Sequence, residues 1–134
     1  MNNKTQIKLI FSIFGKEFNP IDFTKYIGIE PSEFWFFGDS ILNRTELFRK
    51  ESSWNYSIGF VETLFFEELS KSYLNIFQNK MEDIKKFMDL NKLNAKIYII
   101  IEMAEEETPA IYFDRFFLNT LDRLDAEIDM DFYK

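Results

Sequence analysis

The sequence predicts an α+β fold in which helices cover one face of a mainly antiparallel β-sheet. Residues 96–103 are apolar on both faces of an extended chain and rich in β-branched residues, which is typical of an inner strand. Elsewhere, stretches with apolar residues at every second position alternate with stretches in which they recur at three- and four-residue steps. The chain has 134 residues, of which 46% are hydrophobic and 17 are Phe, so we expect one domain, 1–134, with an aromatic-rich core.

The first half of the chain contains an expected strand, helix, strand and loop. Residues 5–14 alternate apolar and polar side chains and predict the first strand. A helix is expected to begin at Asn19-Pro20, because Asn is a favoured N-cap and Pro fits the first helical position, and to end at Gly28. Residues 33–37 predict a short second strand or an aromatic loop, and residues 38–52 predict a loop. The partly buried anchors expected in this loop are Ile41, Leu42, Leu47 and Phe48.

A third strand and a helical segment follow. Residues 53–60 alternate cleanly between apolar and polar side chains, which predicts a strand with one buried face. The apolar side chains of this strand are Trp54, Tyr56, Ile58 and Phe60. Thr63 is expected to cap the helical segment, which reaches residue 91. The capping-box form of residues 79–82 predicts a break near Gln78 and thus two helices, with one long helix as the alternative.

The C-terminal part is expected to add a β-α-β extension. A short extended run is expected at residues 110–113, Asp114 caps the last helix, and this helix ends at Asp125. Residues 126–133 alternate as the last strand. Between the fourth strand and this extension, Glu105, Glu106 and Glu107 predict a solvated acidic turn.

The expected element order is β-α-β-β-α-α-β followed by β-α-β. With the helix pair counted as one layer, the first seven elements match a ferredoxin-like βαββαβ core. In that arrangement the strand at residues 96–103 would lie at an edge, but its two apolar faces predict that the C-terminal strand pairs beside it. The residues expected in the core are Trp54, Tyr56, Ile58, Leu69, Ile97, Ile99, Leu121 and Ile128.

Cysteine and histidine are both absent from the chain. Their absence excludes disulfides, Cys-ligated zinc, thiol catalysis and histidine-assisted nucleophiles, and leaves carboxylate, Lys, Tyr or backbone chemistry. The four glycines are scattered and form no phosphate-binding loop. We therefore expect no enzymatic activity, no cofactor and no metal.

The charge and the hydropathy of the chain limit the classes of partner that we expect. With 16 basic and 23 acidic residues the chain carries a net charge of −7 and has no dense Lys/Arg cluster, so no nucleic-acid binding is expected. No apolar run approaches the roughly 18 residues of a membrane span, and residues 1–8 lack the apolar core of a signal peptide. We expect a cytoplasmic protein that is a monomer or a weak dimer.

Several short motifs carry a family resemblance. They are Gly28-Ile29-Glu30-Pro31, Gly38, residues 49–54 and Asp131-Phe132-Tyr133. With these motifs the chain resembles an uncharacterised bacterial family known only as domain-of-unknown-function family 4279, over nearly its whole length. The resemblance implies an α+β domain with no established activity and no catalytic residues to carry over. Small acidic bacterial proteins of this kind are similar in style to immunity proteins, which neutralise a toxin.

The first candidate site is the polar face of the predicted sheet. Glu127, Asp129 and Asp131 share one face of the last strand, which we interpret as a docking strip for a basic protein partner. The alternatives are a hard-metal site and a solvated face whose like charges discourage edge pairing. The candidate protein-binding residues are Tyr98, Glu102, Glu127, Asp129, Asp131 and Tyr133. The same face is expected to include Gln6, Lys8, Ser12, Ser53, Asn55, Ser57 and Lys96.

The second candidate site is an anion- or ligand-binding cleft in the loop region. Its residues are Trp35, Arg44, Arg49 and Trp54. The alternative is that Trp54 belongs to the core and that the arginines pair with nearby acids. The sequence favours the polar face over this loop. The predicted function is therefore a non-catalytic protein-binding domain, of which an immunity-type protein is one form; a small-molecule-binding domain is the second hypothesis and a carboxylate-dependent hydrolase the third.

Overall fold

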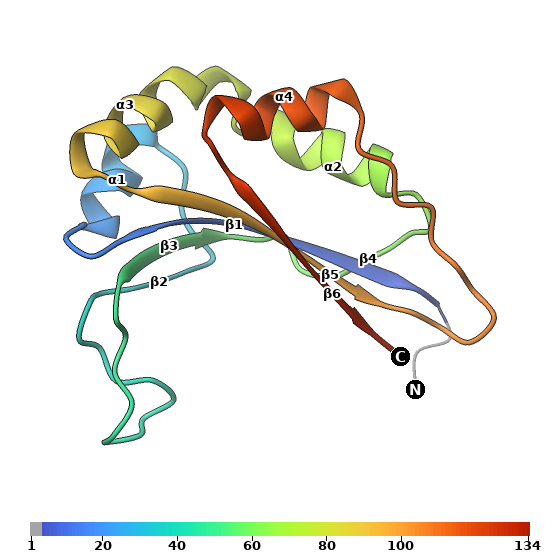
Figure 1. Ribbon diagram of the computed structural model, residues 1–134, viewed down its shortest axis with the longest axis horizontal. Coiled ribbons are helices and arrows are strands. Elements are labelled where there is room, and N and C mark those ends of the chain that lie inside the picture. The colour runs from blue at the N-terminus through green and yellow to red at the C-terminus, as the bar shows by residue number, and fades with distance from the viewer. Residues whose placement is uncertain (1–3) are drawn as a thin grey trace.

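The computed structural model describes residues 4–134 of the chain (Figure 1). Residues 1–3, which belong to the segment expected to lack the apolar core of a signal peptide, lie outside this described part. The strands are β1 (Gln6–Gly15), β2 (Glu33–Trp35), β3 (Ser52–Tyr56), β4 (Val61–Glu62), β5 (Asn94–Glu102) and β6 (Glu127–Tyr133). The helices are α1 (Pro20–Ile27), α2 (Phe66–Asn75), α3 (Met81–Asn91) and α4 (Arg115–Arg123), with a 3-10 turn η1 (Gln78–Lys80).

The strands form one mostly antiparallel sheet in the order β2-β3-β1-β5-β6, and the short β4 pairs with the start of β1. The long strand β1 is antiparallel to β3 on one side and to β5 on the other, whereas β6 runs parallel to β5. All four helices lie over one face of the sheet, and the segment between β2 and β3 projects to the opposite side (Figure 1). The α+β class is confirmed, and so is the inner position of β5, which lies between β1 and β6.

Local capping signals placed two helices correctly. The Asn19 side chain accepts hydrogen bonds from the backbone N–H groups of the first turn of α1, and Gly28 ends this helix with a φ of 74°. Asp114 caps α4 by accepting a 2.8 Å hydrogen bond from the Phe117 N–H. No helix within residues 4–134 is long and apolar enough to cross a bilayer.

The helix caps predicted between residues 63 and 91 are wrong, although the predicted break is confirmed. α2 and α3 are separated by η1, close to Gln78. However, α2 begins after Phe65 and α3 after Lys80, and neither helix has a side-chain cap. The Thr63 hydroxyl instead accepts a hydrogen bond from the Phe65 N–H, in the turn that precedes α2. Packing of their buried faces therefore positions these helices, since both lack the capping bond.

Two predicted core positions and three predicted loop anchors are wrong. Ile58 is 49% exposed because β3 ends at Tyr56 and the chain turns away at Gly59, which has a φ of 84°. Ile128 is 38% exposed because it lies on the edge strand β6. The other predicted core residues are buried or pack against the core. The three loop residues that were predicted as partly buried anchors are exposed instead, because the loop projects away from the core. They are Leu42, Leu47 and Phe48.

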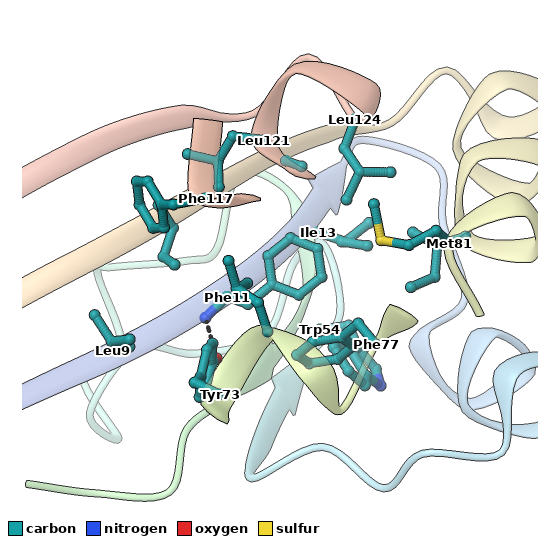
Figure 2. Packing of buried hydrophobic residues seen from close by; sticks show 14 of the residues in the cluster. Leu9, Phe11, Ile13, Trp54, Tyr73, Phe77, Met81, Phe117, Leu121 and Leu124 are labelled. Atoms are coloured by element: carbon teal, nitrogen blue, oxygen red, sulfur yellow. Dashed lines mark hydrogen bonds between the residues drawn. The ribbon is translucent and has the colours of Figure 1, made fainter. Parts of the chain in front are cut away.

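The core lies between the helices and the sheet and is rich in aromatic side chains (Figure 2). Trp54 of β3 is completely buried and meets the Phe23 ring of α1 edge-on at 5.0 Å between centroids. Its indole N–H donates a 3.0 Å hydrogen bond to the Thr24 hydroxyl, which satisfies the one polar group of this side chain. Phe11 and Phe77 make further edge-on contacts with the same ring. Trp54 therefore connects β1, β3, α1 and the segment after α2.

Tyr73 of α2 places a hydroxyl group at the point where β3 and β4 separate along β1. The hydroxyl accepts a 2.9 Å hydrogen bond from the Phe11 N–H, drawn in Figure 2, and donates one to the Tyr56 carbonyl oxygen. Both partners are backbone groups near the end of the β1–β3 ladder. Burial raises the pKa of Tyr73 far above the usual range, because the charged phenolate would lose its hydration. The side chain therefore substitutes for strand pairing where the ladder stops.

Candidate functional site

The strand register places a second set of side chains on the face of the sheet opposite the helices, which we call the open face. Ser12 of β1 lies beside Asn55 of β3 and Lys96 of β5, and Tyr98 lies beside Asp129 of β6. The predicted polar residues of these strands therefore do share one face. The centre of the face is nevertheless apolar, because Ile10, Phe14 and Ile100 point in the same direction.

A cavity of about 580 Å³ lies between the open face and the segment that connects β2 and β3; we call it the loop cavity. Its floor is formed by Ile10, Ser12, Phe14, Ser53, Asn55, Lys96, Tyr98 and Ile100. Its walls are formed by Glu33, Trp35, Ile41, Leu47, Phe48, Arg49, Lys50 and Glu51. The volume falls within the range of about 300–1,000 Å³ that is typical of small-molecule sites.

A buried hydrogen-bond network closes the polar part of the floor. The hydroxyls of Ser12 and Ser53 both donate to Asn55 Oδ1. Asn55 Nδ2 in turn donates a 3.3 Å hydrogen bond to the backbone oxygen of Glu33. The network ties β1, β3 and β2 together, and it holds this end of the cavity floor rigid.

The wall of the cavity carries an oriented arginine. The Arg49 guanidinium carbon lies 3.6 Å from the centroid of the Trp35 ring, which is a close cation–π contact. The loop backbone supports this position: the Gly38 N–H donates to the Arg49 oxygen at 2.8 Å, and the Arg49 N–H donates to the Asp39 oxygen at 2.7 Å. The guanidinium thus lies against the face of the indole at the cavity wall.

Three cations and two carboxylates line the loop cavity: Arg49, Lys50, Lys96, Glu33 and Glu51. Among residues 4–134, the ion pairs within 4 Å are those of Lys85 with Asp89 and Asp125, on the helical side of the molecule. Within residues 4–134, none of the three cations of the cavity therefore has a carboxylate partner at that distance. The lining has an excess of one positive charge, although the whole chain carries −7.

The sequence model of the family described as Domain of unknown function (DUF4279) matches residues 5–134, essentially the whole chain. The chain belongs to the DUF4279 family. No curated protein and no solved structure is significantly similar to it. Of the motifs that carry the resemblance, only residues 49–54 reach the loop cavity of this DUF4279 protein, through Arg49, Lys50, Glu51 and Ser53.

The DUF4279 structure separates the four residues of the predicted ligand-binding cleft. Trp35 and Arg49 lie together in the cavity wall. Trp54 faces the helices instead, because it is one position out of phase with Ser53, which pairs with Trp35 across β2 and β3. Arg44 is exposed in the loop and does not line the cavity. Its grouping with the other three residues was therefore wrong, and so was that of Trp54, whose alternative place in the core is confirmed.

The predicted protein-binding residues lie on the open face of the DUF4279 chain but are divided between two regions. Tyr98 is part of the cavity floor, whereas Glu127, Asp129 and Asp131 follow the edge strand β6 beside it. Glu102 and Tyr133 form the last pair of the β5–β6 ladder. In residues 4–134, no three carboxylates converge as a metal-binding group. The sequence missed Ile10 and Phe14 as site residues, although both are in phase with Lys8 and Ser12 on the first strand.

The acidic turn forms a separate hollow, of about 890 Å³, at the far end of β5. Glu105 and Glu106 are exposed, in line with the predicted solvated turn. Glu107 differs, because its carboxylate accepts a 2.8 Å hydrogen bond from the Thr5 N–H, and this bond lowers the pKa of Glu107. This glutamate therefore attaches the turn to the start of β1.

We assign the candidate site to the loop cavity, where aromatic and apolar groups are combined with oriented cations.

Proposed function

We propose that this DUF4279 protein is a non-catalytic binding domain that takes a small organic molecule in the loop cavity. The observation that carries the proposal is the cavity itself, which combines the Trp35–Arg49 wall with an apolar floor at Ile10 and Ile100. Ligand sites are commonly built in this way, from a mainly apolar surface and a few placed polar groups. The sequence favours the protein-binding hypothesis, whereas the cavity supports small-molecule binding, which we therefore propose first.

The polar groups of the cavity support binding rather than catalysis. The Ser12 and Ser53 hydroxyls donate to an amide oxygen, which cannot activate a nucleophile as a base would. The chain contains no histidine to accept their protons. The arrangement therefore provides recognition groups without a paired nucleophile and base.

Filling the cavity tests the proposal. In Ile100→Trp, the larger side chain is expected to occupy the cavity while the helical side of the sheet is unchanged. Wild-type protein is expected to melt at a higher temperature with at least one member of a panel of common metabolites, since a ligand at 100 times its dissociation constant adds about 2.7 kcal/mol. Ile100→Trp should lose this shift. Leu90→Trp, at an exposed position of α3, is the control and should keep it. A panel without any shift, or a shift retained by Ile100→Trp, would contradict the proposal.

A second candidate function, docking of a basic protein, is favoured by the acidic strip of Glu127, Asp129 and Asp131. These residues lie at alternate positions on an edge strand, where they can steer a positively charged partner. An immunity-type protein that neutralises a toxin would be one form of this function. A toxin gene next to the gene of this protein would support it.

Charge reversal of the strip is the corresponding prediction. Changing Glu127, Asp129 and Asp131 to Lys is expected to slow association with a basic partner, most of all at low salt, because the screening length is about 10 Å at 0.1 M. Stopped-flow association rates at two salt concentrations measure the effect. A control with the same change in net charge reverses exposed acids of the helices: Glu68, Glu82 and Asp122. Equal rates for the two folded triple variants would exclude the strip.

We also propose that the core of the fold is a ferredoxin-like βαββαβ unit. The strand order β2-β3-β1-β5, with antiparallel pairs throughout, supports this reading. β4 and the α4–β6 passage would then be additions to the unit. A solved structure of any family member with a different order of these four strands would contradict it.

A further inference from the structure

We propose that the ligand of the loop cavity is an organic monoanion with a planar apolar body, of which an aromatic carboxylate is the simplest example. This inference rests on the proposed small-molecule function and goes beyond it by assigning the charge and shape of the ligand. Three features of the cavity lead to it: the orientation of Arg49, the balance of charges in the lining, and the composition of the floor.

Arg49 is positioned as an anion-recognition group. A guanidinium presents planar donors that fit the two oxygens of a carboxylate, and stacking on an aromatic ring fixes the plane in which those donors lie. Here the guanidinium carbon lies 3.6 Å from the centroid of the Trp35 ring, and the backbone hydrogen bonds of Arg49 to Gly38 and Asp39 hold the base of the side chain. No carboxylate of residues 4–134 lies within 4 Å of this guanidinium. Its donors are therefore available to an anion from outside the chain.

Lys96 reaches the same cavity from the floor. Its ammonium nitrogen lies 5.5 Å from the Tyr98 ring centroid and 6.0 Å from that of Phe14, and it too has no carboxylate within 4 Å in the described residues. A half-buried cation without a counter-ion is less stable than one that meets an anion. A bound anion between Arg49 and Lys96 would supply that partner from the two sides of the cavity.

The acids of the lining limit the charge of the ligand. Glu33 and Glu51 border the same cavity, so the excess of positive charge is one. A polyphosphate would bring two or more negative charges close to these carboxylates, which repel them. The floor of the cavity is formed by the open face, whereas the helices of residues 4–134 lie over the other face of the sheet (Figure 1), so none of these helices points its N-terminus into the cavity. A single negative charge therefore fits best.

The floor determines the rest of the ligand. Ile10, Ile100 and the rings of Tyr98 and Phe14 form an apolar surface on the strands, and the Trp35 ring stands at the side. A flat apolar body can lie on the side chains of a sheet and exclude water from them, which provides affinity without directional bonds. The Tyr98 hydroxyl forms no hydrogen bond within residues 4–134, so it is available to a polar atom of the ligand.

Matched compounds separate charge from shape. We would titrate the full chain at 0.15 M salt with benzene, naphthalene and indole bodies, each carrying a carboxylate, a primary amide or an aminomethyl group, and measure binding by calorimetry. The carboxylate of at least one body is expected to bind about tenfold or more tighter than its amide, because a charge-assisted hydrogen bond is worth more than a neutral one. The aminomethyl compound is expected to bind most weakly.

Single variants then locate the anion. Arg49→Gln and Lys96→Gln should each weaken the carboxylate about tenfold and leave the amide unchanged. Arg44→Gln removes the same charge from the same loop outside the cavity and should change neither compound, because Arg44 does not line the cavity and its exposed charge is screened by the salt. Lys96 lies on a strand, so its variant reports on the anion even if Arg49→Gln loosens the loop.

The outcomes distinguish the two levels of the proposal. Amides that bind as tightly as carboxylates, or carboxylate binding that neither Arg49→Gln nor Lys96→Gln weakens, would overturn the assignment of an anion and leave small-molecule binding in place. If the aminomethyl compounds bind most tightly, the assignment of an anion would also be overturned, and small-molecule binding would stay in place. If no compound of any charge binds, and the metabolite panel also gives no shift, both the anion assignment and the proposed function fail.

Discussion

Replacing Trp54 with Ala is expected to lower the free energy of unfolding by about 3–5 kcal/mol. The Trp54 side chain is completely buried and meets Phe23, Phe11 and Phe77 edge-on. Its removal therefore leaves a cavity between these rings, and the cavity can be filled only if the rings move. The Thr24 hydroxyl also loses the indole N–H that donates to it. Urea titration followed by circular dichroism measures the loss.

Trp35→Ala is the matched control for this prediction. It is the same truncation in the neighbouring strand but on the open face, where Trp35 is only half-buried. Its expected loss is about 1 kcal/mol, from the contact with Arg49 and a little buried area. Equal losses in the two variants, or a loss below about 1 kcal/mol for Trp54→Ala, would show that Trp54 does not lie in the core.

Tyr73→Phe is expected to lower the free energy of unfolding by about 2–4 kcal/mol, although it removes only one oxygen atom. That oxygen accepts from the Phe11 N–H and donates to the Tyr56 carbonyl, so the variant leaves two backbone groups without a partner. Each such orphan costs roughly 1–3 kcal/mol when it is buried. Tyr112→Phe, at an exposed position, is the control and should change stability by less than about 0.5 kcal/mol. If Tyr73→Phe also lowers the free energy of unfolding by less than about 0.5 kcal/mol, a water molecule must bind the two backbone groups in place of the hydroxyl.

The pH dependence of the same variant provides a second measurement. Burial raises the pKa of Tyr73 in the folded state above the value of about 10 for an unfolded tyrosine. Its contribution to stability is therefore complete below about pH 10 and is lost as the pH rises further, because the unfolded state releases the proton first. Wild-type protein and Tyr112→Phe should lose stability between pH 9 and 11 more steeply than Tyr73→Phe. Identical slopes in urea titrations at these pH values would contradict a buried Tyr73 hydroxyl.

Local signals were sufficient for the elements whose ends depend on their own residues. Asn19, Gly28 and Asp114 act within a few residues of the chain, and each is where the sequence predicted it. The two apolar faces of β5 also revealed its inner position, because a residue's phase on a strand determines which layer it meets. The polar side of the sheet was predicted for the same reason.

Predictions failed where a long-range contact competes with the local pattern. The alternation of residues 53–60 continues past Tyr56, but Gly59 turns the chain and Tyr73, from a distant helix, takes over the hydrogen bonds. Ile128 continues the apolar phase of its strand, yet no further strand of the described part of the chain pairs with β6. Gly59 is visible in the sequence, but the contact with Tyr73 and the edge position of β6 depend on residues outside these segments.

The candidate site shows the same division. Sequence alone grouped Trp35 with Arg49 in one candidate cleft and placed Ser12, Asn55, Lys96 and Tyr98 on one face of a sheet. It treated these as two competing surfaces. Only the tertiary structure showed that they line one cavity, because the loop between β2 and β3 reaches the open face of β1 and β5, which are not its neighbours in the chain. The position of a loop over a sheet depends on contacts between distant residues, and no periodicity within the loop encodes it.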